Sequence, residues 1–205
     1  MDVRKAIWHG IDPYEGFRDW ADKEVPLSGW DIRSQVIKTE IDNIKPKQIL
    51  EIGAHQGASA CWMAMCAPEA HILTVDPWVF YGKYKYESRL HRFAFAQDYF
   101  RRCVVSQGLT DQITYLPMTS DKAFHMFGVD FPDWEWDLAY IDGGHSYEQC
   151  LQDIKNAHLV VRGPIIVDDY NEKDFPGVCK AVQDFCKRAD EKFIVKGRKA
   201  VIAPS

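Results

Sequence analysis

The sequence predicts an α/β fold in which a mostly parallel sheet of seven strands closes with an antiparallel hairpin. Short apolar runs alternate along the chain with longer stretches of helical periodicity, which is the pattern of βαβ units. Two of these runs stop abruptly at carboxylates, one at Asp142 and one at Asp168 and Asp169. Because ligands bind beyond the carboxyl ends of parallel strands, we expect these acidic groups to meet at a functional edge of the sheet.

The length of 205 residues predicts a single domain over residues 1–205. Hydrophobic residues at 46% and charged residues at 27% are typical of a globular protein with a sizeable core. We expect residues 1–44 to form an N-terminal helical cap or lid, and residues 45–205 to form the α/β core.

The charge balance argues against nucleic acid as the main partner. Lys and Arg number 25 against 30 Asp and Glu, and nucleic-acid binding depends on phosphate neutralisation by basic side chains. No apolar run has the length of a membrane span, and no signal-peptide pattern follows the first residues, so we expect no membrane partner. The six cysteines include no Cys-x-x-Cys pair, which favours reduced core thiols in a cytoplasmic protein.

The first half of the chain begins with irregular sequence and continues with a βαβ unit. Residues 1–30 are rich in Trp, Pro and Gly and predict short helices, and their tryptophans would suit a homodimer. The periodicity then predicts a helix over Asp31–Ile44, a strand over Gln48–Ile52, a helix over Ala58–Cys66 and a strand over His71–Val75.

The turn of this unit is Gly53-Ala-His-Gln-Gly57, which lacks the middle glycine of a dinucleotide-binding turn. Asp76 follows the second strand, 23 residues after Gly53, where a carboxylate can accept hydrogen bonds from ribose hydroxyls. The unit therefore favours a nucleoside without phosphates. The alternative is that Asp76 only caps a loop.

Residues 79–100 interleave aromatic and basic side chains. Such interleaving occurs in single-stranded nucleic-acid sites, but the acidic total weakens that interpretation. We expect a loop that leads into a helix and forms one wall of an acceptor pocket. A plain amphipathic surface helix over residues 93–105 is the alternative.

The second half continues the alternation of strands and helices. Ser120 or Asp121 follows the third strand and is expected to cap the next helix, or to contact an adenine. The predicted elements are strands over 113–117, 137–141 and 164–167, a short helix after Asp121, helices over 147–161 and 175–189, and a hairpin of 192–196 and 199–203.

Four motifs in this order resemble those of the class I S-adenosylmethionine-dependent methyltransferases: Glu51-Ile-Gly-Ala-His-Gln-Gly-Ala-Ser59, Val75-Asp-Pro-Trp78, Ile141-Asp-Gly-Gly-His-Ser-Tyr147 and Ile166-Val-Asp-Asp-Tyr170. The resemblance covers roughly residues 45–205 and implies a Rossmann-like three-layer sandwich. It is closest to the small O-methyltransferases related to macrolide-sugar, aminocoumarin-sugar and cephalosporin-biosynthesis enzymes, and more distant from the catechol type.

The resemblance implies a set of residues that bind the cofactor. Glu51, Gly53 and Gly57 would form the loop under its methionine part, and Ser59 could bind the carboxylate. The ribose and adenine would be contacted by Asp76, Trp78 and Ser120.

The resemblance also implies a divalent cation, with Mg²⁺ expected, held by Asp142, Asp168 and Asp169. Three carboxylates at one sheet edge repel one another unless a cation lies among them. His145 stands where the catechol type has a catalytic lysine, so either His145 or Asp142 is expected to accept the hydroxyl proton. Taken singly, the two aspartates could instead form a strand-end turn with a helix cap, and His145 could cap the helix that begins near Ser146.

The predicted function is methyl transfer from S-adenosylmethionine to a hydroxyl of a small molecule, such as a sugar, a diol or a phenolic natural product, assisted by a divalent cation. Two other classes stay open. One is a catalytically silent cofactor-binding protein of the same fold, and the other is an RNA or nucleotide methyltransferase.

Overall fold

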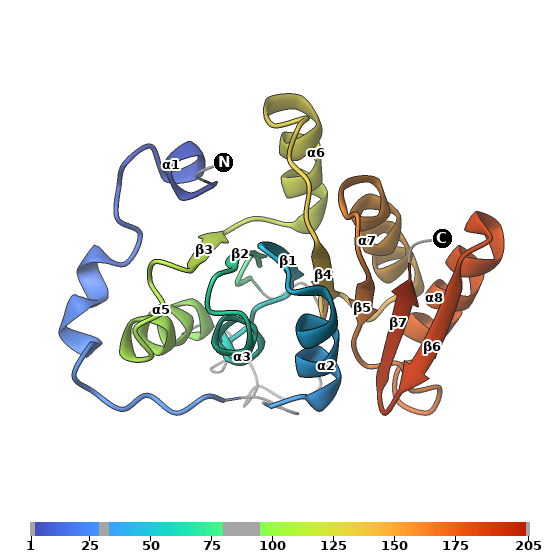
Figure 1. Cartoon of the computed structure of the whole chain (residues 1–205), viewed down its shortest axis with the longest axis horizontal. Coiled ribbons are helices and arrows are strands. Elements are labelled where there is room, and N and C mark those ends of the chain that lie inside the picture. Colours follow the sequence, from blue (N-terminus) through green and yellow to red (C-terminus); the bar gives the residue numbers. More distant parts are fainter. Residues whose placement is uncertain (1–2, 29–32, 80–94, 204–205) are drawn as a thin grey trace.

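The computed structural model describes residues 3–28, 33–79 and 95–203. Seven strands form one sheet in the order β3-β2-β1-β4-β5-β7-β6 (Figure 1). Their bounds are β1 (Gln48–Ile52), β2 (His71–Val75), β3 (Ile113–Leu116), β4 (Leu138–Ile141), β5 (Ile165–Val167), β6 (Lys192–Lys196) and β7 (Lys199–Ala203).

The first five strands are parallel, and β7 enters antiparallel between β5 and β6. Strand β1 lies at the centre of the five parallel strands and pairs with β2 on one side and β4 on the other, as Ile52 does with Val75 and Ile141. The carboxyl ends of β1, β2 and β4 therefore lie side by side. The predicted mostly parallel sheet with a closing hairpin is confirmed.

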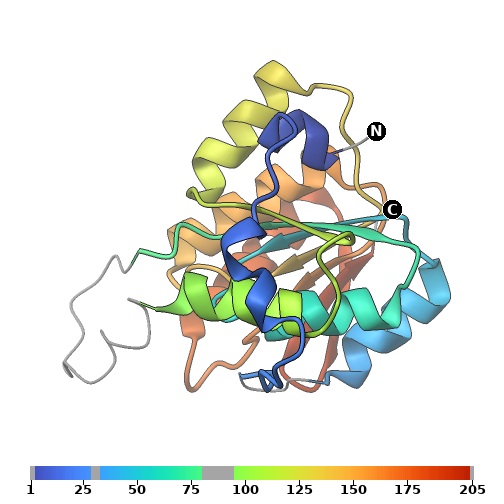
Figure 2. The same ribbon diagram turned by 90° about the vertical axis from the view of Figure 1, so that its left-hand side faces the viewer.

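Helices cover both faces of the sheet and make three layers, which Figure 2 shows edge-on. One hydrophobic cluster joins the sheet to α6, α7 and α8, and a second joins it to α2, α3 and α5. The bounds are α2 (Gln35–Ile44), α3 (Ala58–Cys66), α5 (Ala96–Ser106), α6 (Ser120–Asp130), α7 (Tyr147–Val160) and α8 (Pro176–Ala189).

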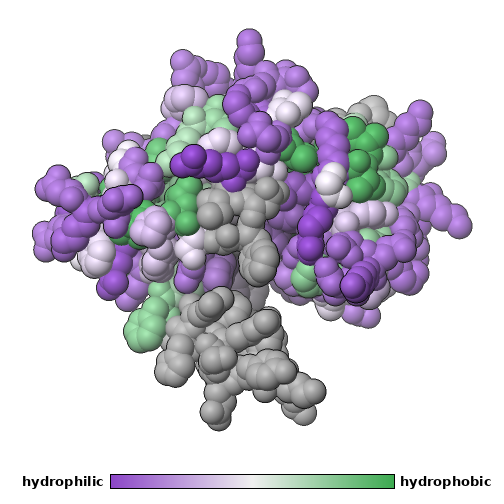
Figure 3. Space-filling view, turned by 90° about the horizontal axis from the view of Figure 1, so that it is seen from below, coloured by the Kyte–Doolittle hydropathy of each residue, from purple (hydrophilic) through white to green (hydrophobic). Residues whose placement is uncertain are grey.

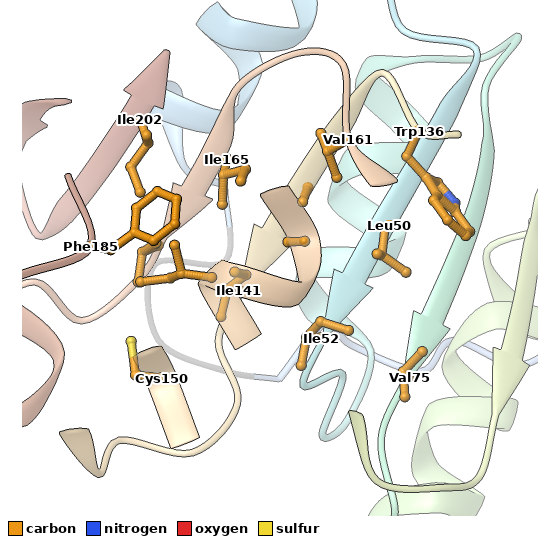
Figure 4. Packing of buried hydrophobic residues seen from close by; sticks show 14 of the residues in the cluster. Leu50, Ile52, Val75, Trp136, Ile141, Cys150, Val161, Ile165, Phe185 and Ile202 are labelled. Carbon is orange, nitrogen blue, oxygen red and sulfur yellow. The ribbon is translucent and has the colours of Figure 1, made fainter. Parts of the chain in front are cut away.

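The two clusters use alternate residues of the central strands, because successive side chains of a strand point to opposite faces. In β1, Leu50 and Ile52 belong to the cluster under α7 and α8, whereas Ile49 belongs to the other. Figure 4 shows Leu50 and Ile52 on this face of the sheet with Trp136 and Phe185. Trp136 is 2% exposed and Leu50 is fully buried, so this face of the sheet is closed to water.

The N-terminal segment forms the short helices α1 (Val3–Trp8) and η1 (Glu15–Trp20), as predicted. It lies along the edge strand β3, because the Trp8 indole donates to the Tyr115 carbonyl at 3.1 Å and the Tyr14 hydroxyl donates to the Ile113 carbonyl at 3.0 Å. A role of this segment as a lid stays a prediction.

The starts of α2 and α5 differ from the prediction. The helix expected from Asp31 begins at Gln35, since Ser34 is extended (ψ 119°) at the N-cap, and residues 29–32 lie outside the described part. The helix expected from Phe93 begins at Ala96. Residues 80–94 also lie outside the described part, so the acceptor-pocket wall predicted there stays untested.

All six cysteines are free in the structure and five of them are buried, so most of these thiols lie in the core, and their reduced state stays a prediction. The face seen in Figure 3 is mainly hydrophilic, with hydrophobic atoms in separate patches. Among the described helices, none combines the length and the apolar character needed to cross a membrane.

Candidate active site

The loop after β1 packs against the loop after β4 so closely that it requires glycine. Gly53 has φ +91°, and a Cβ atom there would lie 2.2 Å from the carbonyl oxygen of Asp142. Gly57 has φ +87°, and its Cβ would lie 2.8 Å from the Phe100 ring. A φ near +90° combined with such a close approach is tolerated by glycine alone. The Gly-x-x-x-Gly spacing thus brings the β1 loop directly onto the backbone of Asp142.

Asp76 ties the end of β2 to this glycine loop. Its Oδ2 atom accepts hydrogen bonds from the backbone amides of Ala54 at 3.0 Å and His55 at 2.8 Å. Its Oδ1 atom accepts from the Trp78 amide at 2.6 Å, and the Trp78 indole donates to the His55 carbonyl at 2.7 Å. Asp76 therefore does cap the loop, and its role toward a ribose stays a prediction.

Glu51 lies fully buried beneath the same loop. Its Oε1 atom accepts a hydrogen bond from the Ser59 hydroxyl at 2.5 Å, and its Oε2 atom has no hydrogen-bond partner among the described residues. Burial raises the pKa of Glu51 to about 7, and the nearby charges of Asp142 and Asp76 add to this rise. A buried carboxylate thus lies directly under the glycine loop.

Ser120 begins α6 but does not cap it. The N-cap is Thr119, and it makes no side-chain capping bond. The Ser120 hydroxyl instead accepts from the Gln149 amide at 3.2 Å, and Gln149 also donates to Asp153 Oδ1 at 3.1 Å. The prediction of capping by Ser120 is therefore wrong.

Sequence reasoning missed Gln149 and Asp153. The signal for Asp153 in the sequence was an acidic residue on the apolar side of a predicted helix. In the structure this side chain is only 1% exposed.

Asp142, Asp168 and Asp169 lie at the same edge of the sheet because they follow the neighbouring strands β4 and β5. The Asp142 amide continues the sheet by donating to the Ile52 carbonyl at 2.8 Å, and the Asp168 amide donates to the Ile141 carbonyl at 2.9 Å. The ends of β1, β4 and β5 are thus level, as predicted.

The structure places Asp142, His145 and Asp169 in one cluster, with one candidate ligand atom from each lying within 4.8 Å of the others. His145 Nε2 is 3.1 Å from Asp169 Oδ2 and 3.8 Å from Asp142 Oδ1. The two carboxylates raise the pKa of His145 to about 9. Burial raises the pKa of Asp142 to about 6, against the lowering effect of His145.

The carboxylate of Asp168 is held apart from this cluster. Its Oδ1 atom is 2.9 Å from Lys199 Nζ, and its Oδ2 atom accepts a hydrogen bond from the Tyr140 hydroxyl. Asp169 pairs with Arg198 at 2.9 Å as well as with His145. Tyr140, Arg198 and Lys199 were missed from the sequence, although two successive basic residues at the hairpin turn were a visible signal.

His145 does not cap α7, because Ser146 is the N-cap and its hydroxyl accepts from the Gln149 amide at 3.2 Å. The His145 ring packs on Phe175 with 4.5 Å between ring centres. Gly177, in the first turn of α8, lies so near that its Cβ would be 2.8 Å from the His145 carbonyl oxygen. The imidazole is therefore packed in place beside the two carboxylates rather than used to end a helix.

Comparisons with known proteins agree with the fold. The model of the methyltransferase domain family Methyltransf_24 matches residues 50–170. No curated protein has a significant sequence match to the chain.

Three solved structures illustrate the likeness. The O-methyltransferase from Bacillus cereus, solved in complex with SAH, is 13% identical, with 98% of this chain and 95% of that chain covered and a TM-score of 0.60. TomG from Streptomyces achromogenes, an O-methyltransferase of tomaymycin synthesis solved with SAM, is 14% identical, with coverage of 93% and 90% and a TM-score of 0.57. CalS11, a TDP-rhamnose 3′-O-methyltransferase of calicheamicin biosynthesis, is 16% identical, with coverage of 84% and 78% and a TM-score of 0.56.

The likeness to these structures concerns the fold, whereas the family model covers more than half of the sequence. The glycine loop, the capped end of β2 and the acidic edge of the sheet all lie within or next to the matched residues. The chain belongs to the methyltransferase domain family and has the class I fold of S-adenosylmethionine-dependent methyltransferases.

Proposed function

We propose that the protein transfers the methyl group of S-adenosylmethionine to a hydroxyl of a small molecule such as a sugar, a diol or a phenol. The observation that carries this proposal is the direct contact between the two halves of the site. Because the Gly53 backbone touches that of Asp142, a cofactor on the glycine loop would lie next to the Asp142–His145–Asp169 cluster. A methyl donor and a proton acceptor are then neighbours, as an in-line transfer requires.

The glycine loop supplies features that fit the cofactor. The positive φ angles of Gly53 (+91°) and Gly57 (+87°) shape the tight turn on which the methionine part of the cofactor is proposed to lie. Below it lies the buried Glu51 carboxylate, whose Oε1 atom accepts the Ser59 hydroxyl and whose Oε2 atom has no hydrogen-bond partner among the described residues; both side chains are proposed to serve the methionine end. Asp76, Trp78 and Ser120 are proposed to contact the ribose and adenine.

The protonation states assign different roles to the two candidate catalytic residues. His145, with a pKa of about 9, carries a proton at neutral pH and cannot accept another. Asp142, with a pKa of about 6, is mainly ionised there and can accept the hydroxyl proton. We therefore assign proton acceptance to Asp142. The His145 imidazolium would stabilise the negative charge that develops on the acceptor oxygen.

A divalent cation is the second part of the proposal, with a revised set of donors. Asp142, Asp169 and His145 have donor atoms close enough to hold it, whereas Asp168 is engaged by Lys199. When bound, a cation would lower the pKa of an acceptor hydroxyl. It would also require neutral His145, so it would compete with the proton on that ring.

The proposal is tested with Asp142→Asn and His145→Gln in an assay of S-adenosylhomocysteine release over a panel of sugars, diols and phenols. Both variants should lose about 100-fold or more in turnover while keeping cofactor affinity, since neither residue is assigned to cofactor binding. Asp111→Asn, at a carboxylate whose side chain is 95% exposed, is the control and should keep full activity. Tight cofactor binding by the wild type without turnover on any hydroxyl acceptor would support the catalytically silent alternative instead.

A further inference from the structure

Lys199 is a buried ammonium group next to the proposed site. Its side chain is only 2% exposed, and its Nζ atom lies 2.9 Å from Asp168 Oδ1. The same oxygen accepts the Asp169 amide at 2.7 Å, and the other oxygen accepts the Tyr140 hydroxyl. The carboxylate of Asp168 is thus oriented by three donors, and a carboxylate that is only 13% exposed and has this many partners is held firmly in one position.

The carboxylate of the next residue, Asp169, has different partners from that of Asp168. Asp169 has a left-handed backbone (φ +55°), and its carboxylate contacts His145 at 3.1 Å and Arg198 at 2.9 Å. Two successive carboxylates are therefore paired with two successive cations, Arg198 and Lys199. The repulsion on which the sequence-based prediction of a metal ion rested is therefore relieved in part by charges of the chain.

Use of Asp168 as a metal ligand would have a large cost in this arrangement. The carboxylate would have to leave Lys199, and separating the partners of a well-buried ion pair is destabilising. A divalent cation close to Asp168 would also meet the positive charge of Lys199 at short range, where burial weakens screening.

We propose that Lys199 is a positioning residue that withholds Asp168 from cation binding, so that the wild-type protein binds divalent cations weakly and only through Asp142, Asp169 and His145. This inference rests on the proposed function only where it gives Lys199 a role in catalysis, and the claim about cation binding does not depend on it. Replacement of the ammonium with an uncharged side chain frees Asp168 and converts the cluster into a tighter cation site.

The test is Mn²⁺ binding, measured by calorimetry and by the electron paramagnetic resonance of free Mn²⁺, on the full chain without cofactor or acceptor. Lys199→Met should bind Mn²⁺ at least about tenfold more tightly than the wild type, because a repulsive charge is removed and a ligand is gained. Lys199→Arg keeps the charge, so its Mn²⁺ affinity should stay as weak as that of the wild type. Lys192→Met, at an exposed lysine on neighbouring β6, is the matched control and should equal the wild type.

A second set of variants keeps the test decisive if Lys199→Met fails to fold. In the wild-type background, Asp168→Asn removes no ligand but leaves the Lys199 charge less compensated, so it should lower Mn²⁺ affinity less than Asp169→Asn, which removes a ligand and should lower it severalfold. The double variant Lys199→Met with Asp168→Asn removes both charges of the pair and should return Mn²⁺ affinity to the wild-type value. Equal affinity of Lys199→Met and wild type, or a loss on Asp168→Asn as large as on Asp169→Asn, would overturn the proposal.

Cofactor affinity of the same samples separates this inference from the proposed function. S-adenosylmethionine binding that is retained while Mn²⁺ binding follows the pattern above supports both. The same Mn²⁺ pattern without any methyl transfer would leave the role of Lys199 standing and remove the proposed activity.

Discussion

Substitution of Gly53 by alanine tests whether the contact between the β1 and β4 loops is as tight as it appears. The new Cβ atom would lie 2.2 Å from the Asp142 carbonyl oxygen, 2.6 Å from its carbon and 2.8 Å from the Gly143 nitrogen. These are backbone atoms, so the clash can be relieved only if a strand end moves. Such overpacking costs about 1–3 kcal/mol. The positive φ of +91° adds about 1–2 kcal/mol of backbone strain for a residue with a Cβ.

Gly10 provides a matched control for the backbone strain alone. Its φ is +88°, and no atom lies within 4 Å of a Cβ built there. Gly10→Ala should therefore cost only about 1–2 kcal/mol, whereas Gly53→Ala should cost about 2–5 kcal/mol. Gly57→Ala meets the Phe100 side chain at 2.8 Å instead of backbone atoms and should fall between them.

The assay is urea unfolding of the three variants and the wild type, followed by calorimetry with S-adenosylmethionine. Gly53→Ala should also weaken cofactor binding and lower turnover, because relief of the clash displaces both the glycine loop and Asp142. Equal free energies of unfolding for Gly53→Ala and Gly10→Ala would refute the close approach of the two loops.

Three further predictions concern the buried interior. Glu51 has a pKa raised to about 7 from an ordinary 4.5, so its stabilising contribution is full below pH 4.5 and is lost as pH rises through 7. Glu51→Gln should remove about 2.5 kcal/mol of this pH dependence, measured as the difference between its urea unfolding curves and those of the wild type at pH 5 and pH 8. Leu50→Ala, at a fully buried position, should cost about 2–5 kcal/mol of unfolding free energy by the same method, and a cost below 1 kcal/mol would contradict the packing described. Tyr14→Phe removes the hydrogen bond to the Ile113 carbonyl and should cost about 0.5–1.5 kcal/mol in thermal unfolding.

The sheet was predictable because buried parallel strands are read from the sequence as continuous apolar runs. The bounds of Gln48–Ile52 and His71–Val75 agree to the residue, as does the hairpin on either side of Gly197. Helix starts were less predictable. The apolar periodicity continues through Ser34, but its ψ of 119° places it before the helix as the N-cap. Periodicity reports which residues are apolar and not where the backbone dihedral angles change, so it cannot locate this start.

The candidate site was predictable in its location and less so in its contacts. The strand ends gather Asp142, Asp168 and Asp169, and this follows from parallel topology. The sequence does not show that adjacent acids turn apart, because this depends on the positive φ of Asp169. It also does not show that Lys199 reaches Asp168, since the register of β7 against β5 arises from tertiary pairing.

The place of β7 in the sheet has a consequence for the order of assembly during synthesis. Among the described strands, β7 is the last to be made, yet it inserts between β5 and β6 and carries Lys199 to Asp168. A nascent chain that ends before residue 198 therefore has β1 to β5 available for pairing but lacks both basic partners of the acidic edge. We expect the earlier strands to collapse first and the electrostatics of this edge to be completed only when the hairpin docks.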